Sequence, residues 1–306
     1  MVKVFKVDSS FDYSVVVGTS CAFGVFDGVH RGHKFLLQQA CETAHNKGGL
    51  SLALTFDRDP DEVYRPQSLK KLMTNERRIQ ALAESGVDAV IVFPFTEEFG
   101  AQSPQEFLAS SFKGVSPSTL HVGLDFHFGS HASGSVADLR RWGDAVGMQV
   151  FAYDLALDAG APITATRIRR LLADCKVEEA VALLGHPYTF TGRVVQGRGE
   201  GASMGFATAN LALSREFQTL GEGVYAARVT MDDVHYKCAM SVGPAPSFEK
   251  AVAPVEAHIL DFSGDLYGKD IEIEPVTLLR PMIKFETVEE LIATVTSNIE
   301  WVRRNI

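Results

Sequence analysis

The sequence predicts an α/β domain followed by a β domain. From residue 1 to about residue 184, short apolar or β-branched runs alternate with helical patterns, which is typical of strands and crossover helices in a parallel sheet. Beyond 185–187 the pattern changes to closely spaced strands separated by Gly, Pro and Asp turns, and we expect a small antiparallel barrel there. A chain of 306 residues is long enough for two cores, so the predicted domains are 1–184 and 185–306.

The first half contains a strand, a glycine-rich turn and a helix in direct succession. A buried strand is predicted over 21–25, and the apolar residues that follow recur at helical spacing until Gly48 and Gly49, which can end the helix. A later strand is predicted over 87–93. After it, residues 103–106 form a capping-box pattern with Pro at the first helical position, so a helix is expected to begin there.

The second half is predicted as a series of strands and one terminal helix. The strands share β-branched or aromatic residues between turn signals, and they cover 189–195, 223–230, 236–242, 255–262 and 271–279. The residues that fall on one face of the last helix, and would pack over the barrel, are Val288, Leu291, Ile292, Val295, Ile299 and Val302. No internal repeat relates the two halves.

Composition argues against several classes of protein. The net charge of −9 and the lack of a Lys/Arg cluster argue against a nucleic-acid partner, because binding to a phosphate backbone needs concentrated positive charge. The four cysteines are scattered without a CxxC pair, which favours a cytoplasmic location. The first residues lack the apolar core of a signal peptide and no later run could span a bilayer, so no membrane association is expected.

The segment 24–33, Gly-Val-Phe-Asp-Gly-Val-His-Arg-Gly-His, carries the strongest functional signal. It places His30 and His33 where a strand leads through glycines into a helix. A helix N-terminus offers unpaired N–H groups and partial positive charge, so this arrangement favours a phosphate, to which the histidines would add donors. A zinc site is the weaker alternative, because His pairs on one helix face usually stand four apart and no third ligand is close in the sequence.

This segment resembles the HxGH signature of the bacterial bifunctional riboflavin kinase and FAD synthetase family. Further blocks resemble the family in the same order, at 54–56, 72–77, 86–88, 122–129 and 163–169, and then at 205–210, 223–225, 255–262 and 266–269. The resemblance spans nearly the whole chain. It implies a Rossmann-like HxGH nucleotidyltransferase domain, followed by a six-stranded antiparallel β-barrel riboflavin-kinase-like domain with a terminal helix.

The resemblance also implies roles for residues of the first domain. The FMN phosphate would attack the α-phosphorus of ATP and release pyrophosphate. His30 and His33 would hold the ATP phosphates, while Thr166, Arg167 and above all Arg169 would close on the triphosphate. The other residues that the resemblance places at the nucleotide site are Gly24, Phe26, Asp27, Gly28, Gly32, Asp125 and Phe128.

Some residues of the first domain allow a second interpretation. Asp125 and Phe128 suit a strand end and a core aromatic equally well. Arg58 and Asp59 stand where the family tends to have Pro and His, and His127 replaces a frequent Arg. These differences leave open an adenylyltransferase that acts on a different phosphate ester.

In the second domain, the resemblance implies a kinase site. Thr208 and Asn210 would bind Mg²⁺ and the ATP phosphates through oxygen atoms, and Gly205 would line the nucleotide site. Glu256 would accept the proton of the ribityl 5′-hydroxyl as that oxygen attacks the γ-phosphorus of ATP. Without the resemblance, Thr208 and Asn210 suit a polar turn, and Glu256 suits an outward-facing position on a strand.

The second domain departs from the family pattern more than the first. Ala207 stands in place of a Pro, Ala202 in place of Arg or Lys, and Ser241 in place of Asn. A proline at 207 would fix φ, so its absence loosens the loop without deleting a ligand. The main hypothesis is a bifunctional enzyme with riboflavin, FMN, FAD and ATP as ligands and Mg²⁺ as cofactor. The alternative is a monofunctional FMN adenylyltransferase whose barrel is a noncatalytic flavin-binding or regulatory module.

Overall fold

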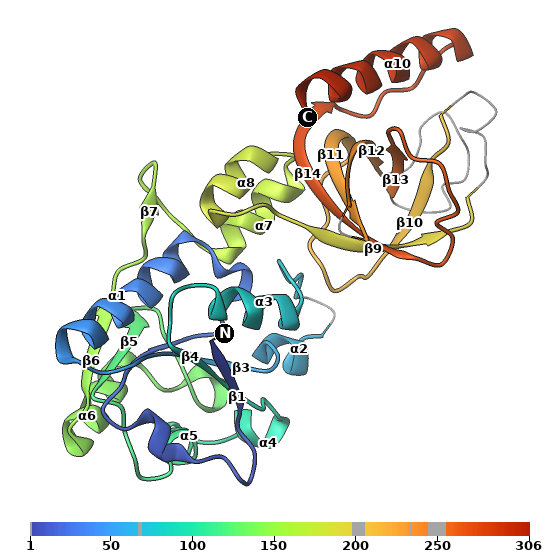
Figure 1. The fold of residues 1–306 in the computed structure, drawn as a ribbon. Coiled ribbons are helices and arrows are strands. Elements are labelled where there is room, and N and C mark those ends of the chain that lie inside the picture. The colour runs from blue at the N-terminus through green and yellow to red at the C-terminus, as the bar shows by residue number, and fades with distance from the viewer. Residues whose placement is uncertain (1, 67–68, 198–205, 233, 244–254) are drawn as a thin grey trace. The chain divides into compact units, whose positions relative to one another are not determined.

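The computed structural model describes residues 2–66, 69–197, 206–232, 234–243 and 255–306 (Figure 1). The chain forms two compact units, Met1–Ala165 and Thr166–Ile306. This division groups 166–184 with the second unit, and the domain boundary between 184 and 185 stays a prediction.

The first unit is built on a parallel sheet of six strands in the order β1-β4-β3-β2-β5-β6. Its strands are β1 (Lys3–Lys6), β2 (Ser20–Phe23), β3 (Ser51–Phe56), β4 (Ala89–Phe93), β5 (Thr119–Gly123) and β6 (Gln149–Tyr153). A small antiparallel hairpin follows, formed by β7 (Leu157–Asp158) and β8 (Ala161–Pro162). The Rossmann-like prediction is confirmed.

Two helices of the first unit have the end signals that were predicted from the sequence. They are α1 (Arg31–Lys47), α2 (Pro60–Tyr64), α3 (Asn75–Ala83), α4 (Glu97–Gly100), α5 (Pro104–Phe112) and α6 (Val136–Val146), with 3₁₀ turns η1 (Tyr13–Val16), η2 (Asp27–Val29) and η3 (Ser130–Ala132). Gly48 ends α1 in the left-handed conformation, with φ of 65°. Ser103 and Glu106 form the predicted capping box of α5.

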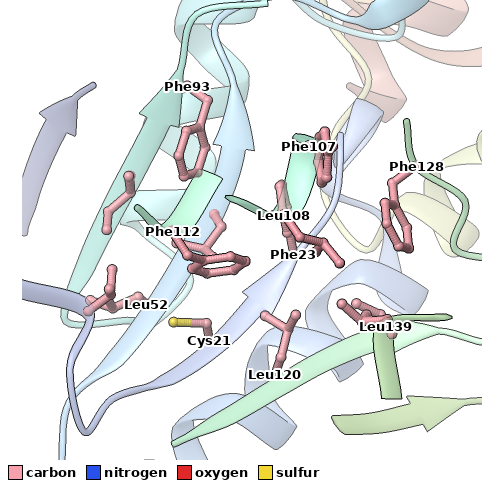
Figure 2. Packing of buried hydrophobic residues seen from close by; sticks show 14 of the residues in the cluster. Cys21, Phe23, Leu52, Phe93, Phe107, Leu108, Phe112, Leu120, Phe128 and Leu139 are labelled. Atoms are coloured by element: carbon pink, nitrogen blue, oxygen red, sulfur yellow. The ribbon is translucent and has the colours of Figure 1, made fainter. Parts of the chain in front are cut away.

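Both faces of this sheet are buried, as expected for parallel strands. On one face, Phe23, Leu52 and Phe93 pack with Phe107 of α5 and Leu139 of α6, and Figure 2 shows these side chains gathered in one layer. The alternate strand residues belong to a second cluster with α1 and α3, which includes Ala22, Ala53, Val90, Leu37 and Leu82. The sheet thus lies between two apolar layers, and the loops and helix starts that follow its strands carry the candidate site.

The second unit is a closed antiparallel barrel in the order β10-β13-β12-β11-β14-β9. Its strands are β9 (Phe190–Val195), β10 (Ala209–Leu213), β11 (Gly223–Met231), β12 (Val234–Val242), β13 (Val255–Ile259) and β14 (Asp270–Arg280). The six-stranded barrel is confirmed, although periodicity alone did not identify β10. Strand β13 ends earlier than predicted, and Asp261 just beyond it has a left-handed φ of 58°.

In the described part of the second unit, the helices are α7 (Ala165–Ala173), α8 (Val177–Leu184) and α10 (Val288–Asn305). Val302 is fully buried against the barrel, with Ile299 packed beside it. At the other end of α10, Val288 is 56% exposed, so the predicted packing of the whole face is wrong for that residue, which lies in the first turn of α10. Among the described residues, no helix combines the length and the apolar character needed to cross a membrane.

Candidate active sites

The turn between β2 and α1 carries strained backbone. Phe26 and Val29 have left-handed φ values of 61° and 37°, which bulky residues rarely adopt. The carbonyl of Val25 accepts hydrogen bonds from Arg78 Nη1 at 2.7 Å and from Thr55 Oγ1 at 3.2 Å. Side chains from α3 and β3 therefore hold this turn in a conformation that its own residues would not favour.

Asp27 and two glycines complete the turn. The carboxylate of Asp27 is almost buried and accepts the N–H of Leu72 at 3.1 Å. Gly28 has φ of 74°, a conformation that glycine adopts without strain. A Cβ on Gly32 would lie only 3.2 Å from the ring of His30, so a glycine there leaves room for that ring.

The two histidines form a stacked pair at the start of α1. His30 is the N-cap residue, and its Nδ1 accepts the N–H of His33 at 3.4 Å. The ring centroids are 3.6 Å apart with an interplanar angle of 18°, and Phe26 meets the ring of His33 edge-on. A Cβ on Gly24 would in turn lie 3.2 Å from the Phe26 ring. The side chains of the motif thus pack against one another.

His33 is held in its neutral form. Its pKa lies well below the ordinary value, first because the ring is buried and then because His30 and Arg78 disfavour a further positive charge. Its Nδ1 is buried and has no hydrogen-bond partner among the residues that the structure describes. A neutral imidazole beside a helix N-terminus can exchange hydrogen bonds with phosphate oxygens, and this unpaired nitrogen is suited to such a ligand.

Arg78 is the principal site residue that the sequence analysis missed. It is 2% exposed, and its guanidinium also donates to Thr55 Oγ1 at 2.6 Å, to the Phe56 carbonyl at 2.7 Å and to Asn75 Oδ1 at 3.2 Å. Burial lowers its pKa, and nearby carboxylates led by that of Asp27 oppose this effect. One signal in the sequence could have found it: Arg78 stands four residues before Leu82, so the two side chains lie on the same, buried face of α3.

Asp59 occupies a position where the family tends to have His. It caps α2 by accepting the N–H of Asp61 at 2.8 Å. Burial raises its pKa to about 6, and the charge of Asp27 also raises it. This departure from the family therefore places a carboxyl group that titrates near pH 6 close to the strained turn.

The other predicted residues of the adenylylation site lie on different elements. Asp125 is exposed just after β5, whereas Phe128 is 5% exposed and packs against Phe107, with ring centroids 5.4 Å apart. The core position fits the structural interpretation of Phe128, and its contact with a nucleotide stays a prediction. Thr166, Arg167 and Arg169 all lie on α7, in the second unit. That they close on ATP stays a prediction.

In the barrel, strand register brings the predicted kinase residues together. Asn210 of β10 pairs with Glu256 of β13, which in turn pairs with Ser241 of β12. Directly paired residues lie on the same face of a sheet, so the three side chains share one face. Val255 and Ala257 on either side of Glu256 are buried, which confirms that Glu256 alternates with core residues.

Three further features lie on or beside this face. Asn210 is 7% exposed and packs against Gly197, where an added Cβ would clash with the Asn210 amide. Thr208 lies two residues before Asn210, in the segment that leads into β10. The carbonyl of Ala207 accepts a hydrogen bond from His258 Nδ1 at 2.9 Å. Gly205 and Ala202 lie outside the described residues.

The oxygen atoms of two predicted ligands suit a hard cation. The Thr208 hydroxyl and the Asn210 amide supply oxygen, the ligand type that Mg²⁺ prefers in combination with water and nucleotide phosphates. In the part of the chain that the structure describes, no group of three or more His, Cys, Asp or Glu is placed to hold a metal ion.

A Rossmann-like domain with a stacked HxGH pair, joined in one chain to a six-stranded barrel, defines a class of nucleotidyltransferase fused to a kinase-like module. Sequence comparison shows the same two parts. The family model described as FAD synthetase matches residues 14–167, and the one described as riboflavin kinase matches 184–306. The chain belongs to the bifunctional riboflavin kinase/FMN adenylyltransferase family.

Individual relatives match over most of their length. The bifunctional riboflavin kinase/FMN adenylyltransferase of Listeria monocytogenes is 34% identical over 89% of this chain and 87% of its own. The protein of the same description from Escherichia coli K12 is 32% identical over 91% and 90%. A crystal structure described as a macrolide-efflux protein from Streptococcus pneumoniae has 27% identity and a TM-score of 0.83, with complete coverage of both chains. That likeness covers the fold of both units.

Proposed function

We propose that this chain makes FAD in two ATP-dependent steps. The barrel phosphorylates riboflavin to FMN and releases ADP, and the α/β domain adenylylates FMN to FAD and releases pyrophosphate. The observation that carries this proposal is the match of both family models to parts of the chain whose local geometry suits each reaction. All four cysteines are free thiols, which agrees with a cytoplasmic location.

In adenylyl transfer, the work of the protein is to align two phosphates and to balance charge. A phosphate oxygen of FMN forms a bond to the α-phosphorus of ATP, and the bond to the pyrophosphate oxygen breaks. His30 and His33 hold the ATP phosphates at the N-terminus of α1, and the fixed turn around Asp27 keeps them in place. Arg169 and its neighbours on α7 add positive charge to the triphosphate.

In the kinase step, Glu256 accepts the proton of the 5′-hydroxyl of riboflavin. The oxygen then bonds to the γ-phosphorus of ATP, and the bond to ADP breaks. Thr208 and Asn210 would hold Mg²⁺ and the ATP phosphates, and the side chain of Asn210 lies on the same face of the sheet as that of Glu256, because the two residues are paired directly. Bound Mg²⁺ would neutralise phosphate charge.

Chromatographic separation of flavins tests both steps. Purified protein is incubated with Mg²⁺-ATP and either riboflavin or FMN, and FAD is expected from both. Glu256→Gln should lower riboflavin phosphorylation by about 10²- to 10⁴-fold and leave FAD formation from FMN unchanged. His30→Ala should lower FAD formation from FMN and leave the phosphorylation of riboflavin unchanged. The activity that each variant retains shows that the variant is folded. FAD from FMN alone would favour the noncatalytic barrel, and no product in either tube would refute the proposal.

A further inference from the structure

The side chain of His258 connects β13 to the segment that carries Thr208. Strands β10 and β13 pair through Ala209–Ala257, Asn210–Glu256 and Leu211–Val255, and the paired register ends there. The next pair in that register would join Thr208 to His258. At this point the His258 Nδ1 donates a hydrogen bond to the carbonyl of Ala207 at 2.9 Å. The side chain therefore extends the connection between the strands beyond the backbone ladder.

The environment of the ring fixes its role in this contact. A carbonyl oxygen can only accept, so the Nδ1 of His258 carries the proton of this bond. The ring of Phe206 meets the His258 ring edge-on, with centroids 6.2 Å apart and an interplanar angle of 88°. His258 lies on the same face of β13 as Glu256, because the two residues are two positions apart on one strand. One side chain thus contacts both residues that precede Thr208.

This contact matters because Ala207 has no ring to fix its backbone. A proline would restrict φ at this position, whereas alanine leaves φ and the direction of the following hydroxyl free. With its carbonyl held by His258, the peptide plane between Ala207 and Thr208 has one orientation. That orientation sets where the Thr208 hydroxyl lies relative to Asn210.

We propose that His258 is a positioning residue of the kinase site, which holds the Ala207 carbonyl and thereby places Thr208 beside Asn210 for Mg²⁺-ATP. This inference rests on the proposed riboflavin kinase function. His258 itself need not touch a substrate. Its loss should act mainly through the KM for ATP, because the ligands remain present but are no longer held in one arrangement.

Three substitutions separate the hydrogen bond at this position from the mere presence of a polar side chain. His258→Asn keeps a nitrogen attached to Cγ, at the position of Nδ1, and should retain kinase kcat/KM for ATP to within about threefold. His258→Leu removes the donor, and His258→Gln moves the amide one bond further away. Both should lower kcat/KM by roughly tenfold, the effect of losing about 1.4 kcal/mol of interaction. FMN adenylylation in the same chain is the internal control and should not change.

A control histidine is available on the neighbouring strand. His235 also has its Nδ1 in a hydrogen bond, to Thr230 Oγ1 at 2.9 Å, but that pair is exposed and remote in register from Glu256. His235→Leu should leave both activities unchanged. In addition, Ala207→Pro in the His258→Leu background should recover part of the lost kcat/KM, because the ring restricts the backbone that the hydrogen bond no longer holds.

A readout that does not depend on turnover is amide hydrogen exchange of the peptide 206–211, measured by mass spectrometry. His258→Leu and His258→Gln should accelerate exchange in this peptide, and His258→Asn should not. Equal kinase kcat/KM and equal exchange in the His258→Asn and His258→Gln variants would overturn the proposal. This comparison does not need the His258→Leu variant, so it decides the question even if that variant fails to fold. If the wild-type protein made no FMN, the proposed function would fail, whereas the exchange measurement would still decide whether His258 holds this segment.

Discussion

Replacing Arg78 with methionine should destabilise the first unit far more than the same change at its neighbour. Arg78 is buried and donates to the carbonyls of Val25 and Phe56 and to two side chains. Arg77 is about half exposed and forms one ion pair, with Glu84. The two arginines are consecutive on α3, so the comparison changes the environment while keeping the residue type and the helix constant.

The expected magnitudes follow from these contacts. Hydrogen bonds from a charged donor contribute about 1.5–3 kcal/mol each. Arg78→Met leaves four acceptors without this donor, and the loss is partly offset because the guanidinium no longer has to be desolvated, so we expect a total cost of about 3–5 kcal/mol. An exposed ion pair such as Arg77–Glu84 contributes roughly 0–1 kcal/mol. Since domains have about 5–15 kcal/mol of stability, Arg78→Met removes a large share.

Urea unfolding followed by tryptophan fluorescence measures this difference. The chain has two tryptophans, and Trp142 stacks on Phe112 in the first unit while Trp301 lies on α10. In a Trp301→Phe background, fluorescence therefore reports the first unit. With a slope of about 2 kcal/mol per molar urea, Arg78→Met should lower the midpoint by about 1.5–2.5 M. Equal, small shifts for Arg77→Met and Arg78→Met would refute the assignment of Arg78 as the residue that holds the strained turn.

Three other predictions concern titration and packing. Because the pKa of Asp59 rises to about 6 on folding, the ionisation of Asp59 destabilises the fold as pH rises between about 4 and 6. Asp59→Asn preserves the helix cap. Measured by urea unfolding, it should raise the free energy of unfolding by up to about 3 kcal/mol at pH 7.5 and change it little at pH 4. Gly197→Ala should displace Asn210 and reduce kinase activity, with FMN adenylylation unchanged in the same preparation; unaltered kinase kcat would contradict the close packing. The ring of His33 should titrate by NMR well below pH 6.5, with its resonances assigned from His33→Gln, and a midpoint near 6.5 would show that the ring is not buried as described.

Local signals predicted the parts of the fold that depend on neighbouring residues in the chain. The capping box at Ser103 and the glycine end of α1 are short-range patterns, and both are confirmed. The outward position of Glu256 also follows from alternation within one strand. Strand β10 escaped notice because its short run follows a polar turn, and nothing within it indicates that it closes a barrel.

The residues that position the two sites are decided by contacts between distant segments. Arg78 looks like half of an exposed basic pair until the fold places its guanidinium against the Val25 carbonyl, 53 residues away. His258 and Ala207 are 51 residues apart and meet only because β10 and β13 pair in one register. A shift of that register by one residue would turn Glu256 away from Asn210 and His258 away from Thr208 together. The candidate ligand-binding residues can therefore be proposed from a motif, whereas the residues that contact and orient them follow from long-range contacts that the motif does not contain.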